Sequence, residues 1–255
     1  MQLQPLADPF AAPGAPDAHG QRVGVLLCHG FTGSPFSMRP WAEHLNAEGF
    51  AVSVPRLPGH GTRWQEMNRT TWQDWYDELT RAFEKLRADN DKVVLAGLSM
   101  GGALSLRLAA DRPREVDGVI LVNPAVNIDR WDIRLVPVLK HVVRAAPGVA
   151  NDIKKPGVDE HGYSRTPLKA LHSSLRGYKA LCADLPKITC PVLFFRSVED
   201  HVVDPSSSRI IMGSISSRDV TERQLEDSYH VATLDNDAPA IYAESADFVR
   251  RVTAP

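Results

Sequence analysis

The strongest candidate for chemistry in this chain is a serine between two glycines, Gly97-Leu98-Ser99-Met100-Gly101. The pattern G-x-S-x-G is typical of a nucleophilic serine on a sharp strand-to-helix turn. Its surroundings fit, because the apolar run KVVLA leads into it and the helical pattern MGGALSLRLAA leads out. Such a turn crowds the backbone, so side chains must be absent two residues to either side. The following helix N-terminus would direct N–H groups toward developing negative charge. We predict that Ser99 is a nucleophile.

A serine hydroxyl is a weak nucleophile until a neighbouring base accepts its proton. In sites of this kind the partners follow in the order serine, acid, histidine. His230 is the best placed of nine histidines, because it lies between the last strand pattern and the last helical pattern. Asp200 follows the apolar run that ends at residue 197 and is the predicted acid. Glu199 is the alternative, whereas Asp204 precedes a proline and is interpreted as a helix N-cap.

The loop His29-Gly30-Phe31-Thr32-Gly33 follows another apolar run. In sites of this kind one backbone N–H of such a loop, and the N–H of the residue after the nucleophile, form the oxyanion hole. We therefore predict that Phe31 and Met100 donate from their backbones and border the substrate pocket with their side chains. The alternative is that His-Gly-Phe is only a tight turn. His29 and His60 are expected to brace their loops, because no spacing supports a metal site.

The elements that must position these residues alternate along the chain. Six apolar or mixed runs indicate strands, at 22–28, 50–54, 92–96, 118–122, 191–197 and 220–225. Five helical patterns lie between or after them, at 37–48, 72–87, 100–110, 205–212 and 239–251. Near-continuous Val, Ile, Leu and Phe are expected when helices cover both faces of a parallel sheet. The predicted class is α/β, with a doubly wound, mostly parallel sheet whose ligands bind beyond the carboxyl ends of its strands.

One interval breaks this alternation. About 70 residues separate the strand pattern that ends at 122 from the next one, although a single crossover helix needs far fewer. We predict a flexible N-terminal arm at 1–20, a core at 21–125 and 190–255, and a small helical cap at 126–189. The alternative is two ordinary crossover units joined by a weak strand.

Composition bounds the class of protein rather than its activity. The 255 residues are 24% charged and 43% hydrophobic, and the net charge of −2 gives no reason to expect a nucleic-acid partner. No apolar stretch approaches the roughly 18 residues of a membrane span, so no integral membrane association is expected. Three cysteines lack disulfide or metal-ligand spacing, and the N-terminus does not have the pattern of a secretory signal. We expect a cytoplasmic protein without a cofactor or metal.

Five motifs in order, HGFTGSP, RLPGHG, GLSMGG, SVEDHVV and SYHVATLDND, resemble the compact bacterial monoacylglycerol lipases and their carboxylesterase relatives. The resemblance extends from about Val25 to the C-terminus and implies the α/β-hydrolase fold. It places the catalytic triad on Ser99, Asp200 and His230 and the oxyanion donors on Phe31 and Met100. The cap segment 152–167 also resembles that family. There Glu160 would recognise the glycerol hydroxyls, and Val149 would be an apolar residue of the substrate passage.

The predicted function is therefore hydrolysis of a carboxylic ester through an acyl-enzyme on Ser99, with a monoacylglycerol or a similar medium-chain ester as substrate. A general carboxylesterase, an acyltransferase, a perhaloperoxidase or a carbon–carbon hydrolase could use the same triad. From another class, a non-catalytic ligand receptor could be built on the same scaffold. Either a monomer or a homodimer is compatible with this prediction.

Overall fold

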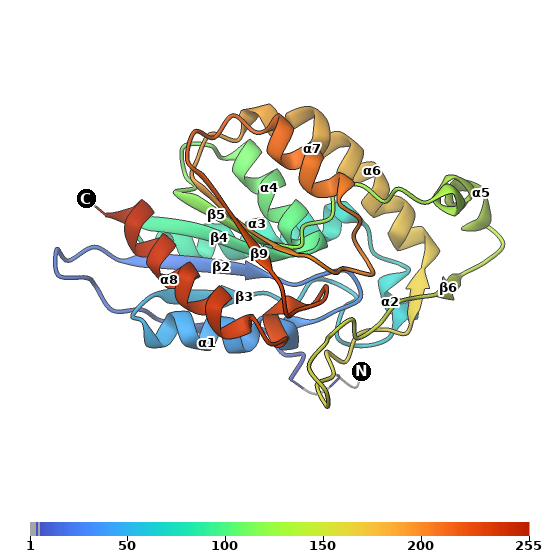
Figure 1. Cartoon of the computed structure of the whole chain (residues 1–255), viewed down its shortest axis with the longest axis horizontal. Coiled ribbons are helices and arrows are strands. Elements are labelled where there is room, and N and C mark those ends of the chain that lie inside the picture. The colour runs from blue at the N-terminus through green and yellow to red at the C-terminus, as the bar shows by residue number, and fades with distance from the viewer. Residues whose placement is uncertain (1–3, 5, 255) are drawn as a thin grey trace.

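A seven-stranded sheet forms the centre of the protein in a computed structural model that describes residue 4 and residues 6–254 (Figure 1). The strand order is β1-β3-β2-β4-β5-β8-β9, and every pair is parallel except β1 with β3. The strands are β1 (Phe10–Ala12), β2 (Val23–Cys28), β3 (Ala51–Val54), β4 (Lys92–Leu98), β5 (Gly118–Val122), β8 (Val192–Ser197) and β9 (Val220–Leu225). All six predicted strands are confirmed, and so is the mostly parallel sheet.

Alternate residues of each strand enter two separate cores, because successive side chains of a strand point to opposite faces. In β4, Val93 and Leu95 belong to one core, and Val94 and Ala96 belong to the other. The first core lies beneath α3 (Trp72–Ala88), α4 (Met100–Asp111) and α6 (Leu168–Asp184), and the second beneath α1 (Arg39–Ala47) and α8 (Ala238–Thr253). The central strands are buried along almost their whole length. This explains why their sequences are apolar throughout rather than alternating.

Helices cover both faces of the sheet, as predicted (Figure 1). They are α1 (Arg39–Ala47), α2 (Trp64–Met67), α3 (Trp72–Ala88), α4 (Met100–Asp111), α6 (Leu168–Asp184), α7 (Ser206–Ser214) and α8 (Ala238–Thr253), with 3₁₀ turns η1 (Pro35–Ser37), η3 (Leu185–Lys187) and η4 (Ala232–Leu234). The five predicted helices correspond to η1 with α1, α3, α4, α7 and α8. None of the helices in the described part of the chain combines the length and the apolar character needed to cross a bilayer.

Part of the predicted N-terminal arm joins the sheet. Residues 10–12 form the edge strand β1, which pairs antiparallel with β3 through Phe10 opposite Val54 and Ala12 opposite Val52. The run Phe-Ala-Ala is too short to give a strand pattern, and pairing with an existing edge is what makes it a strand. Residues 1–3 and 5 of the predicted arm lie outside the described residues.

The predicted cap contains less helix than its apolar spacing indicated. Its elements are η2 (Trp131–Leu135), α5 (Val136–Leu139) and the antiparallel pair β6 (Ala145–Pro147) and β7 (Arg165–Pro167), joined by irregular segments. Several large apolar side chains there are exposed, among them Trp131, Val138 and Val142. The helical spacing in this stretch therefore does not correspond to one continuous buried stripe.

Helix α6 lies within the interval predicted as cap, but it packs into the main core. Ala170, Tyr178 and Leu181 are buried in the same core as α3 and α4. At Gly177 the helix meets α3 so closely that a Cβ atom would lie 2.2 Å from Trp72 Cδ2. Helix α6 is thus the crossover helix between β5 and β8, and the irregular segments precede it.

This contact gives a stability prediction. Gly177→Ala should lower the free energy of unfolding, because the overpacking cost of about 1–3 kcal/mol exceeds the gain of about 1 kcal/mol from replacing a helical glycine by alanine. Gly213→Ala in α7 is the matched control, since a Cβ there would meet nothing within 4 Å beyond its chain neighbours and its own helix backbone. That variant should be neutral or slightly stabilised. Urea unfolding measures both, and equal effects of the two substitutions would contradict the packing of α6.

Candidate active site

Ser99 lies at the turn between β4 and α4 in a backbone conformation that few non-glycine residues adopt, with φ 55° and ψ −121°. The turn is crowded on both sides. A Cβ at Gly97 would lie 2.5 Å from the backbone of Gly101, and a Cβ at Gly101 would lie 2.1 Å from the carbonyl oxygen of Cys28. Both glycines are therefore required by close backbone contacts, as the sequence predicts. The side chain of Ser99 lies at the carboxyl end of the sheet, directly after β4.

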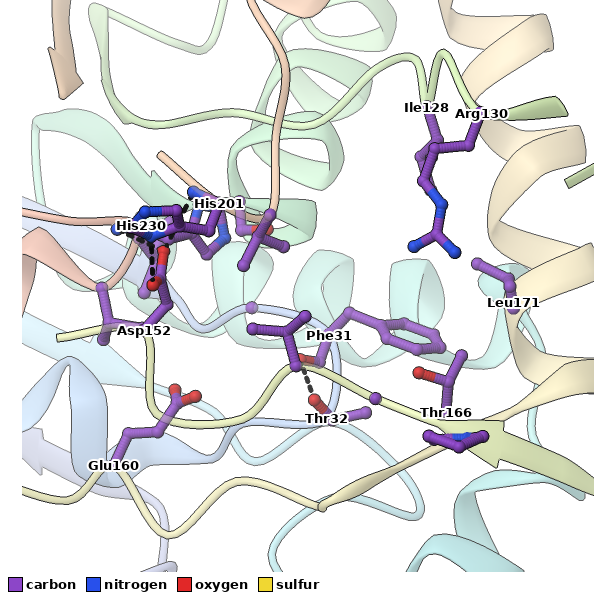
Figure 2. A pocket seen from close by; sticks show the side chains of 18 of the residues that line it. Phe31, Thr32, Ile128, Arg130, Asp152, Glu160, Thr166, Leu171, His201 and His230 are labelled. Carbon is purple, nitrogen blue, oxygen red and sulfur yellow. Dashed lines mark hydrogen bonds and ion pairs between the residues drawn. The ribbon is translucent and has the colours of Figure 1, made fainter. Parts of the chain in front are cut away.

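A pocket of about 450 Å³ opens above this turn and is lined by Ser99 and His230 together. Figure 2 shows His230, His201, Asp152 and Glu160 on one side of it, and Phe31, Thr166 and Leu171 toward the other. Ser99 is only 7% exposed, so the pocket is its route to a ligand. The structure thus brings together two of the predicted site residues that are far apart in the sequence.

Asp200 contacts the imidazole directly, with 2.8 Å between His230 Nδ1 and Asp200 Oδ2. A carboxylate can only accept, so Nδ1 carries the proton and Nε2, on the opposite side of the ring, can act as an acceptor. The other carboxylate oxygen, Oδ1, accepts from the backbone N–H groups of Val202 and Val203 at 2.8 Å each. The carboxylate is therefore held from both sides. Glu199 pairs with His201 instead.

His230 and Asp200 each stabilise the charged form of the other. Burial disfavours the imidazolium of His230, but the Asp200 carboxylate, with Glu160 and Asp152 adding to it, outweighs burial and raises the pKa of His230 above its ordinary 6.5. Burial likewise disfavours the Asp200 carboxylate, yet the His230 charge and the hydrogen bonds to Asp200 lower its pKa overall. The site can accommodate a proton on His230 while Asp200 remains ionised.

The loop before η1 approaches Ser99 closely, since a Cβ at Gly30 would lie 3.3 Å from Ser99 Cβ. His29 braces this loop, as predicted: its Nδ1 lies 3.0 Å from the Gly30 carbonyl and its Nε2 accepts from Leu57 N–H at 3.2 Å. Burial lowers the pKa of His29 to about 4, so the ring is neutral and able to accept. Phe31, which follows Gly30 in this loop, lines the pocket.

Met100 departs from its prediction in one respect. Its side chain is fully buried in the core, where the Ser174 hydroxyl contacts the sulfur at 3.8 Å, and so does not border the pocket. Met100 is the first residue of α4, a position at which the backbone N–H has no partner inside the helix. Only the backbone of Met100 can therefore contribute to an oxyanion hole.

Glu160 and Val149 both line the pocket, from the cap. Oε1 of Glu160 accepts from the Asn151 backbone N–H at 3.1 Å, and the side chain points toward the pocket in Figure 2. Burial raises the pKa of Glu160. Val149 also lines the pocket but is 55% exposed. Arg130, which the sequence did not suggest, also lines the pocket and pairs with Asp132.

A further residue that the sequence did not suggest is Asn123, which is buried at the end of β5 with φ 44°. Its Nδ2 donates to the His230 carbonyl and to Ser197 Oγ, each at 2.9 Å, and its Oδ1 accepts from Ser197 N–H at 2.8 Å. Asn123 thereby ties the end of β8 to the His230 loop. A polar residue directly after an apolar strand was the only available signal.

In the part of the chain that the structure describes, no group of three or more His, Cys, Asp and Glu side chains is arranged to bind a metal ion. His29 and His60 pack ring against ring, with centroids 5.0 Å apart. His201 instead forms a hydrogen bond with Asp152, with 2.8 Å between His201 Nδ1 and Asp152 Oδ1, and both residues line the pocket.

Most of the chain matches a known protein family. Residues 20–237 match the Hydrolase_4 family, described as serine aminopeptidase, S33. The chain belongs to this family. The matched range contains Ser99, Asp200 and His230. The mostly parallel sheet with its crossover helices is the α/β-hydrolase fold, as the resemblance in sequence implied.

Relatives of this chain include proteins named as lipases. It is 40% identical to a thermostable monoacylglycerol lipase from Bacillus sp. (strain H-257), over 95% of this chain and 94% of the relative. A solved structure from work on the metagenome-derived lipolytic enzymes LipS and LipT has a TM-score of 0.92 and 38% identity, covering 98% of this chain and 100% of the other. The monoacylglycerol lipase of Paleococcus ferrophilus, at 22% identity over 99% and 100% of the two chains and a TM-score of 0.79, shows the fold.

Proposed function

We propose that this protein is a serine hydrolase that cleaves carboxylic esters, with monoacylglycerols as its preferred substrates. The 2.8 Å contact between His230 and Asp200, beside a pocket that also exposes Ser99, is the observation on which the proposal depends. The 40% identity to a protein named as a monoacylglycerol lipase favours an ester over a peptide bond. We also propose the cytoplasm as its location, which the three free cysteines favour.

The reaction has two acyl-transfer steps. Ser99 Oγ attacks the ester carbonyl carbon as His230 Nε2 accepts its proton, and Asp200 stabilises the imidazolium. The carbonyl oxygen becomes an oxyanion and accepts from the Phe31 and Met100 N–H groups. The intermediate collapses, His230 protonates the departing alcohol, and an acyl-enzyme remains on Ser99. Water then repeats the sequence with His230 as base and releases the carboxylic acid.

The composition of the pocket supports a substrate with one apolar and one polar end. Ile128, Ile133 and Leu171 line the pocket and belong to one apolar cluster, where an acyl chain can be buried. Glu160 lies on the side of His230 (Figure 2), where the leaving alcohol must sit to receive its proton. A carboxylate there can accept hydrogen bonds from the two free hydroxyls of a glycerol group. A simple alkyl alcohol would not use it.

The nucleophile is tested by Ser99→Ala. This variant should lose at least about 1,000-fold in turnover of a short p-nitrophenyl ester, because no other group can form the acyl-enzyme. An organophosphonate should label the wild type at Ser99 and should not label the variant. Circular dichroism checks that the fold is intact. Undiminished ester turnover by the variant, or wild-type turnover of an aminoacyl p-nitroanilide but of no ester, would refute the proposal.

The alcohol group is tested by Glu160→Gln. The substitution should lower kcat/KM for a monoacylglycerol by roughly 10- to 100-fold, the worth of a hydrogen bond to a charged group. The methyl ester of the same fatty acid should lose little, because it offers no hydroxyl to Glu160. Asp159→Asn, at an exposed neighbouring carboxylate, is the matched control. Equal losses for the two esters would remove the glycerol assignment and leave a general carboxylesterase.

A further inference from the structure

Asp152, in the cap, makes several contacts with the two loops that bear Asp200 and His230. Its Oδ2 accepts from the backbone N–H groups of His230 and His201, each at 3.2 Å, and its Oδ1 lies 2.8 Å from His201 Nδ1. Its backbone carbonyl accepts from Val231 N–H at 3.0 Å. The carboxylate is only 9% exposed. One cap residue thus contacts the loop of the acid and the loop of the base at the same time.

Asp235 makes the reciprocal contacts from the loop of the base to the cap. It is 1% exposed, and its carboxylate accepts from the backbone N–H groups of Lys154 at 2.7 Å and Lys155 at 2.8 Å. The same carboxylate accepts from Tyr229 N–H at 2.9 Å, one residue before His230. Each of the two segments therefore supplies a carboxylate to the backbone of the other. We call Asp152 and Asp235 the aspartate clamp.

The backbone of His230 is hydrogen-bonded through both its carbonyl and its N–H. The carbonyl of His230 is held by Asn123 from the sheet, whereas the N–H of His230 is held by Asp152 from the cap. Hydrogen bonds from N–H groups to a buried carboxylate are stronger than neutral ones, and removing the acceptor leaves the donors unsatisfied. The backbone of His230 is therefore positioned by the core and the cap together.

We propose that Asp152, assisted by Asp235, is a positioning residue for His230, so that the cap fixes the geometry of the base as well as covering the substrate. This proposal rests on the proposed function, in which His230 is the base. Proton transfer depends on placement at the level of about 1 Å, so a loop released on one side should slow the chemical step more than substrate binding.

Several charged or titratable groups face His230, and together they determine the pKa of its imidazole. Asp200 contacts the ring, and Glu160 and Asp152 approach from the cap, each favouring the imidazolium. His201 lies in the pocket wall between Asp152 and Glu199. Replacing Asp152 by a neutral residue removes one charge that favours the imidazolium. The acid limb of kcat/KM, which reports the protonation of His230 in the free enzyme, should then move to lower pH.

The experiment compares Asp152→Ala, Asp152→Asn and a matched control in full-length protein, with a p-nitrophenyl ester as substrate. The control is Asp227→Ala, which removes the ion pair of Asp227 with Lys154 between the same two segments. Asp227 is 62% exposed, and exposed pairs of this kind contribute little. Asp227→Ala should stay within about threefold of the wild type in kcat and KM.

Asp152→Ala should lower kcat by roughly 10- to 100-fold and leave KM within about threefold. Asp152→Asn keeps a hydrogen-bond acceptor, so it should recover most of kcat while its acid limb still lies at lower pH than that of the wild type. A kcat equal to that of the wild type in Asp152→Ala, or a rise in KM alone, would overturn the proposal. If Asp152→Ala does not fold, the pH profile of Asp152→Asn decides, and an unmoved acid limb overturns it.

Labelling by an organophosphonate separates the two proposals. If the wild type is not labelled at Ser99, the proposed function itself fails. If it is labelled normally and the Asp152 variants match it in rate and pH profile, only the clamp fails.

Discussion

The site depends first on the crowded backbone turn at Ser99. The carbonyl of Cys28, at the end of β2, leaves no space for a side chain at Gly101, and the backbone of Gly101 leaves none at Gly97. Neighbouring parallel strands and the first turn of α4 can approach this closely only because both positions lack a Cβ. The approach gives Ser99 its positive φ and directs its side chain into the pocket. A substitution at either glycine would displace the sheet, the helix or the serine.

The remaining groups reach Ser99 because parallel strands end at the same edge of the sheet. The loops after β2, β5, β8 and β9 hold Phe31, Asn123, Asp200 and His230, respectively, and the order of these strands makes the loops neighbours in space. Loops in general are mobile, however, and strand order alone does not place an imidazole. Buried polar side chains supply the rest: Asn123 in the core donates to the His230 carbonyl, whereas Asp152 in the cap accepts from the His230 N–H and Asp235 in the same loop as His230 accepts from the Tyr229 N–H.

The sequence predicts the part of this arrangement that local patterns encode. Apolar runs predict the six strands, and the glycines around Ser99 predict the turn. Chain order then selected Asp200 and His230, which the structure brings into contact. Among the features that the sequence does not predict are the strand at Phe10–Ala12, the core position of α6 and the contacts of Asp152. Each depends on a partner distant in sequence, such as the β3 edge, Trp72 of α3 or the His230 N–H. Neither composition nor periodicity reports such a partner. The side chain of Met100 was misplaced for the same reason, since its contact is Ser174 of α6.

The central claim is that Ser99 becomes acylated while His230 and Asp200 handle the proton. Rapid acid quenching of the enzyme during turnover of a p-nitrophenyl ester, followed by tryptic digestion and mass spectrometry, tests it most directly. Cleavage after Lys92 and Arg107 releases residues 93–107, which contain Ser99. We expect one acyl group on this peptide, located at Ser99 and formed before the acid product accumulates. Steady ester turnover in which the acyl group never appears on Ser99, or appears on another residue, would contradict it.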